Sequence, residues 1–104
     1  MSVTIPTGTE LRAKALDRVK GYVCKDRQAT HGDAEDNFNT IARLWSAYKG
    51  VEFNALDVAA MMALLKVSRM KTSPEHIDNW DDLAGYAICG AGLVEARKLT
   101  TPVL

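Results

Sequence analysis

The segment from Asn54 to Met70 constrains the fold most, because apolar residues occupy almost every position of a helix-length run. Leucine, valine, methionine and alanine side chains would cover nearly every face of this helix. A helix without a polar face is typical of the interior of a larger helical assembly. The sequence therefore predicts a helix at the centre of a bundle, with Asn54 and Asp57 forming a cap at its start.

Three more helical blocks are separated from this one by glycine, proline and polar clusters. Apolar residues recur in them at helical spacing, and no segment predicts a strand. The fold class is therefore all-α, a four-helix arrangement. At 104 residues the chain has room for one domain, over residues 1–104. The expected helices cover about 7–24, 34–49, 54–70 and 78–98.

Charge and cysteine content exclude several classes of protein. Thirteen Lys plus Arg balance thirteen Asp plus Glu, so the overall field does not favour direct DNA binding or attachment to a membrane. Cys24 and Cys89 lie far apart and indicate neither a zinc site nor a disulfide framework. No leader and no membrane-length apolar run is visible. We expect a cytoplasmic protein.

Two carboxylates stand four residues apart in the last block. Asp78 and Asp82 share a helix face with Tyr86 and Cys89. Two aspartates so placed favour a hard cation such as Mg²⁺, held together with substrate phosphates. The alternative is that Asp78 caps the helix, with Asp81 as its partner in the first turn.

The same block has an unusually small-sided surface. Glycine destabilises a helix by roughly 1 kcal/mol relative to alanine, so three glycines indicate that another backbone or a ligand approaches closely. The small residues are Ala84, Gly85, Ala87, Gly90, Ala91 and Gly92.

Lys66 interrupts the apolar run of the third block, and a buried ammonium requires an anionic partner. The alternative is that its side chain extends to the surface. With Arg69, three residues later, it could bind phosphate oxygens. The segment 31–39 leads into the second helix and places His31 in a loop and Glu35 one turn from Asn39. Such a helix start can bind a base or a metal. The alternative is that His31 is a solvated loop residue.

Three segments together resemble a known group of proteins. They are Thr30-His-Gly-Asp-Ala-Glu-Asp-Asn-Phe38, Asp57-Val-Ala-Ala-Met-Met-Ala-Leu-Leu-Lys-Val-Ser-Arg69 and Asp78-Asn-Trp-Asp-Asp-Leu-Ala-Gly-Tyr86. Over about 27–94 the chain resembles a family of small phage and prophage proteins of uncharacterised function. That family is itself similar to the MazG-like, all-α nucleoside triphosphate pyrophosphohydrolases.

The resemblance implies a set of acids that hold Mg²⁺ or Mn²⁺. MazG-like enzymes carry E-x-x-E on one helix and E-x-x-D on a later one. Asp82 matches the final acid, Asn79 stands where the acid before it would be, and neither Ala60 nor Met61 supplies a second acid after Asp57. The acids implied as catalytic and metal-binding residues are Asp57, Asp78, Asp82 and Glu35.

The activity implied is attack by a metal-activated water on a nucleoside triphosphate, with release of pyrophosphate. The resemblance also implies a MazG-like bundle that forms a homodimer or homotetramer, in the host cytoplasm if a phage encodes it. One alternative is a phage protein that binds or sequesters a nucleotide on the same fold without catalysis. Another is a purely structural helical interaction module. For a nucleotide substrate, we expect Lys66 and Arg69 to bind the phosphates. The residues expected to bind the base and the sugar are Asn37, Asn39, His31 and Trp80.

Overall fold

The computed structural model describes residues 3–26 and 34–100, most of which are helical. Within these ranges it contains four α-helices, one short π-helix and no β-strand, which confirms the all-α class. The elements are α1 (Gly8–Gly21), the π-helix η1 (Tyr22–Asp26), α3 (Ala34–Lys49), α4 (Ala55–Met70) and α5 (Ile77–Thr100).

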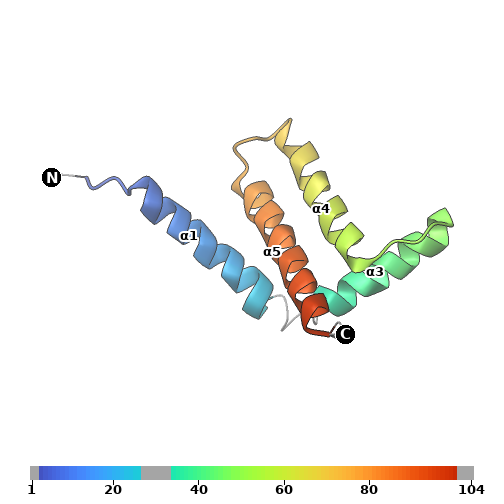
Figure 1. Ribbon diagram of the computed structural model, residues 1–104. Helices are drawn as coiled ribbons and strands as arrows, with labels where there is room; N and C mark the ends of the chain where they lie inside the picture. The colour runs from blue at the N-terminus through green and yellow to red at the C-terminus, as the bar shows by residue number, and fades with distance from the viewer. Residues whose placement is uncertain (1–2, 27–33, 101–104) are drawn as a thin grey trace.

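The helices form an open arrangement. Figure 1 shows α4 and α5 side by side and antiparallel, with α3 crossing near the start of α4. Helix α1 meets α5 beside η1 and diverges from it towards the N-terminus. The radius of gyration is 16.9 Å, whereas a compact chain of about 100 residues has a value of about 13 Å. Several helix faces therefore have no partner within the described chain.

Local capping explains where the helices begin. The Thr7 side chain accepts a hydrogen bond from the Glu10 amide (3.1 Å) at the start of α1. At the start of α4, the Asp57 amide donates to the Asn54 side chain, and the Asn54 amide donates to the Asp57 carboxylate, each at 2.9 Å. These reciprocal bonds confirm the predicted cap of α4.

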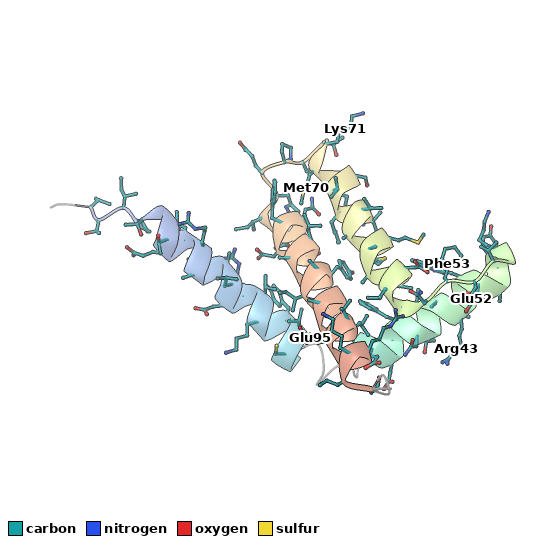
Figure 2. The ribbon with its side chains drawn as sticks, viewed as in Figure 1. Arg43, Glu52, Phe53, Met70, Lys71 and Glu95 are labelled. Atoms are coloured by element: carbon teal, nitrogen blue, oxygen red, sulfur yellow. The ribbon has the colours of Figure 1, made fainter. Side chains whose placement is uncertain are left out.

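The turn between α3 and α4 is fixed by one hydroxyl. Ser46 Oγ donates to the Ala42 carbonyl (2.7 Å) and accepts from the Phe53 amide (2.8 Å). The Phe53 ring packs edge-on against Trp45, with 6.1 Å between ring centroids. Figure 2 shows Phe53 in the segment that joins the two helices. Gly50, which follows α3, has a positive φ of 70°, a conformation that glycine adopts without strain.

A small core lies where α3, α4 and α5 meet. Phe38 and Val58 are its largest fully buried side chains, at 1% and 0% exposure. The helically spaced apolar residues of α3 enter this core through Phe38, Ile41 and Trp45. Tyr48 continues the same spacing but is 87% exposed, because the end of α3 extends past α4 (Figure 1). The other buried residues of the core are Ala42, Ala55, Ala59 and Leu93.

Helix α4 does not lie at the centre of a bundle in the described chain. Leu64 is 65% exposed, Val67 47%, and Met61 and Leu65 41% each. Helix α4 packs against α5 and α3, whereas α1 packs against α5. The predicted central position is therefore wrong for the single chain. An apolar pattern shows that a helix avoids water, but it does not show which neighbour covers each face.

Candidate functional site

Two adjacent aspartates of α5 each bind a cation from a different helix. Asp81 is 5% exposed and accepts two hydrogen bonds from Arg18 of α1, from Nε at 2.7 Å and from Nη2 at 3.2 Å. This two-point contact ties α1 to α5. The hydrogen bond to Asp81 raises the pKa of the Arg18 guanidinium, burial opposes the shift, and the charge of Asp81 adds to it.

The second pair joins α4 to α5. Lys66 Nζ lies 2.9 Å from Asp82 Oδ2, and Lys66 is only 9% exposed. The buried ammonium therefore has the anionic partner that the sequence requires. The Asp82 side chain is 41% exposed, so its carboxylate still reaches solvent.

A pocket opens beside these aspartates, between η1, α3 and α5, and we call it the η1 pocket. Its volume is about 100 Å³. The Phe38 and Tyr86 rings lie 6.2 Å apart and 33° from parallel. Because π-helical turns are frequently found at functional sites, the position of η1 on this wall is consistent with a binding role. The η1 pocket is lined by Tyr22, Val23, Phe38, Asp81, Asp82, Gly85, Tyr86 and Cys89.

A second pocket adjoins the first. It has a volume of about 260 Å³, shares Val23, Phe38 and Cys89 with the η1 pocket, and is also lined by Glu35. The two pockets together reach the lower end of the range of about 300–1,000 Å³ that is typical of small-molecule sites. Asp82 and Glu35, two of the predicted acids, thus lie on neighbouring parts of one concave surface.

The other two predicted acids have local roles elsewhere. Asp57 belongs to the cap of α4. Asp78 lies in the first turn of α5, not before it, and approaches His76 Nε2 at 3.8 Å, so the interpretation of Asp78 as the cap residue is wrong. Asp57 lies in the first turn of α4 and Asp78 in the first turn of α5. Because the two helices are antiparallel (Figure 1), these two acids lie at opposite ends of the helix pair.

The described residues do not fit the multi-acid magnesium site that the resemblance implies. Among them, no three histidine, cysteine, aspartate or glutamate side chains are grouped so that they could hold a metal ion. Asn79, which stands where one motif acid would be, is buried at 4% exposure and does not line the η1 pocket.

The residues predicted to bind phosphate, base and sugar are dispersed. Arg69 and Asn39 are exposed on α4 and α3, and Asn37 is half-buried. Trp80 faces away from the η1 pocket, 52% exposed, with its Nε1 donating to the Pro74 carbonyl at 2.8 Å. His31 lies outside the described residues.

The site also contains residues that the sequence did not identify. Arg18 and Asp81 are 63 positions apart, and no local pattern pairs them. Tyr22 looks like an ordinary apolar position of the first helix but lines the η1 pocket. The one available signal was the doubled aspartate at 81–82, because neighbouring helix positions point in different directions and need separate partners.

Comparison with known proteins places the chain among phage proteins. The model of DUF6378, a domain of unknown function, matches residues 14–94. The Gene 55 protein of Mycobacterium phage L5 is 47% identical over 74 residues, covering 70% of this chain and 45% of the relative. The Gene 55 protein of Mycobacterium phage D29 is 36% identical over 74 residues, covering 71% and 49%.

The chain thus spans about half the length of the curated relatives that it matches. No solved structure matches it. None of the helices in the described ranges is both long and apolar enough to cross a membrane.

Proposed function

Since the chain belongs to the DUF6378 family of phage-related proteins, we propose that it binds a nucleotide, with the base in the η1 pocket. The observation that carries this proposal is the pocket lining: the exposed Tyr22 ring, the half-buried Tyr86 ring and the partly exposed Asp82 carboxylate lie on one concave surface, with the buried Phe38 ring packed beside Tyr86. Aromatic side chains bind bases by stacking, worth about 1–3 kcal/mol per base. Such binding would take place in the host cytoplasm.

The carboxylates favour a particular kind of base. Both oxygens of Asp81 already accept hydrogen bonds from Arg18, whereas Asp82 pairs with Lys66 through Oδ2 and is partly open to solvent. A carboxylate accepts from an exocyclic amino group, as aspartate does from N4 of cytosine. The ligand class is therefore a nucleotide whose base carries an amino group, held without help from a resident metal.

Calorimetry with a matched nucleotide panel tests this proposal. We expect CTP or ATP to bind in both EDTA and Mg²⁺, and UTP to bind more weakly. Tyr22→Ala should weaken binding about 5- to 100-fold through lost stacking, and Asp82→Asn should reduce the preference for amino-bearing bases. Tyr48→Ala is the control, because Tyr48 is 87% exposed in the last turn of α3 and does not line the η1 pocket. No binding heat from any nucleotide, or equal loss in the Tyr48 variant, would contradict the proposal.

The pyrophosphohydrolase implied by the MazG-like resemblance is a second candidate, because Asp82 and Glu35 line adjoining pockets. Its test is pyrophosphate release from the same nucleotides with Mg²⁺ or Mn²⁺. We expect no turnover, because no three acids of the described chain come together. Turnover that is lost in Asp82→Ala would replace binding with hydrolysis as the function.

A further inference from the structure

An uncharged stripe of largely exposed residues runs along the face of α5 beside α1. Ile77 and Trp80 are 55% and 52% exposed, Val94 is 39% exposed, and the three alanines between them are exposed as well. Successive members are separated by 3, 4, 3, 4 and 3 positions, which is the spacing of a coiled-coil seam. The stripe, which we call the α5 seam, consists of Ile77, Trp80, Ala84, Ala87, Ala91 and Val94.

A groove beside α1 contains the middle of the α5 seam. It has a volume of about 470 Å³, and its lining includes Trp80, Ala84 and Ala87 from α5 and Leu16 from α1. Leu16 is 68% exposed. Helix α1 diverges from α5 towards its N-terminus (Figure 1).

The order of residues along the α5 seam identifies the occupant. Its positions are symmetric about the midpoint between residues 85 and 86, so an antiparallel copy of α5 places Trp80 opposite Ala91 and Ala84 opposite Ala87. The bulkiest side chain of the seam, Trp80, then meets a small one, and Ile77 meets Val94. A parallel copy would instead place the two Trp80 indoles against each other.

Charge favours the same orientation. The start of α5 and the turn before it carry Glu75 and Asp78, and the last turn carries Arg97 and Lys98. An antiparallel copy brings the acidic end of one helix to the basic end of the other, and the helix dipoles also oppose each other. A parallel copy would bring like charges together at both ends.

From these observations we propose that the protein forms a two-fold symmetric dimer in which α5 of each subunit lies along the α5 seam of the other, within the groove beside α1. The contact is isologous, the usual form of a soluble dimer interface. The 3-4 spacing gives the two helices a left-handed supercoil. This inference does not depend on nucleotide binding, because the η1 pocket opens between η1, α3 and α5, and Trp80 does not line it.

Light scattering and sedimentation measure the subunit number directly. We expect a dimer for the wild type and a monomer for Ala87→Arg, whose dissociation constant should rise about 100-fold or more because an unpaired charge would be buried. Leu64→Arg is the matched control: Leu64 is 65% exposed on α4, away from the seam, and this variant should remain dimeric. A monomeric wild type, or a Leu64→Arg variant that dissociates instead, would overturn the proposal.

Disulfide trapping tests the orientation even if Ala87→Arg does not fold. In a Cys24→Ser, Cys89→Ala background, Ile77→Cys and Val94→Cys together should give a covalent dimer under mild oxidation. Each single variant should give none, because equivalent positions would lie about 25 Å apart along the axis, far beyond the roughly 7 Å that a disulfide spans. Covalent dimers from the single variants, or none from the double variant, would overturn the antiparallel seam.

Discussion

Replacing Val58 with alanine is expected to lower the free energy of unfolding by about 2 kcal/mol. Val58 has 0% exposure in the core between α3, α4 and α5. Removal of two buried methyl groups costs about 1.6 kcal/mol in transfer free energy, and the cavity left behind raises this to about 2–3 kcal/mol. The higher helix propensity of alanine returns a few tenths of a kcal/mol. For a domain of this size, the melting temperature should fall by about 8–15 °C.

The same substitution at Val67 is the control, because Val67 lies on the same helix but is 47% exposed. Val67→Ala should change the free energy of unfolding by less than about 0.5 kcal/mol. Urea unfolding of both variants, followed by circular dichroism at several protein concentrations, measures the difference. Equal and large losses would show that α4 is covered on both faces in solution. No loss at Val58 would refute the packing of α4 described above.

Three further substitutions, with one control, test the turn between α3 and α4 and two of the glycines. Ser46→Ala leaves the Phe53 amide without its hydroxyl acceptor and should cost about 1–2 kcal/mol in urea unfolding, whereas Ser68→Ala on exposed α4 surface should be nearly neutral. Gly50→Ala should lower stability by about 1–2 kcal/mol because φ is +70°. Gly92→Ala should raise stability by about 1 kcal/mol, since a methyl group there meets no atom within 4 Å among the described residues. Calorimetric unfolding measures both changes, and a more stable Gly50→Ala variant or a less stable Gly92→Ala variant would contradict the corresponding expectation.

The three glycines of α5 differ in whether another helix approaches them. The three in α5 predict a close approach by another backbone or a ligand. A methyl group on Gly85 would lie 3.4 Å from Val23, and one on Gly90 would lie 3.7 Å from Ala59, so both positions face packed helices. Gly92 faces open space within the described chain. Composition predicts a small-sided surface, but only the arrangement of helices shows which of its members are in contact.

In the candidate site, too, the sequence predicts which residues share one helix face but not which residues of different helices meet. The common face of Asp82, Tyr86 and Cys89 follows from helical spacing, and all three line the η1 pocket. The expected convergence of Asp57 with these residues does not occur, because the sequence distance between two helices carries no information about which ends meet. The pairing of Arg18 with Asp81 was invisible for the same reason.

The local structures follow from the sequence alone: the four helices and the Asn54–Asp57 cap. Each of these depends on residues within about four positions of one another, whose geometry the backbone fixes. The packing of the helices determines which faces are covered, which cation each aspartate binds, and that α5 keeps an exposed apolar seam. Those outcomes depend on how the helices cross. A hydrophobic pattern does not determine the crossing geometry, because the hydrophobic effect is non-directional.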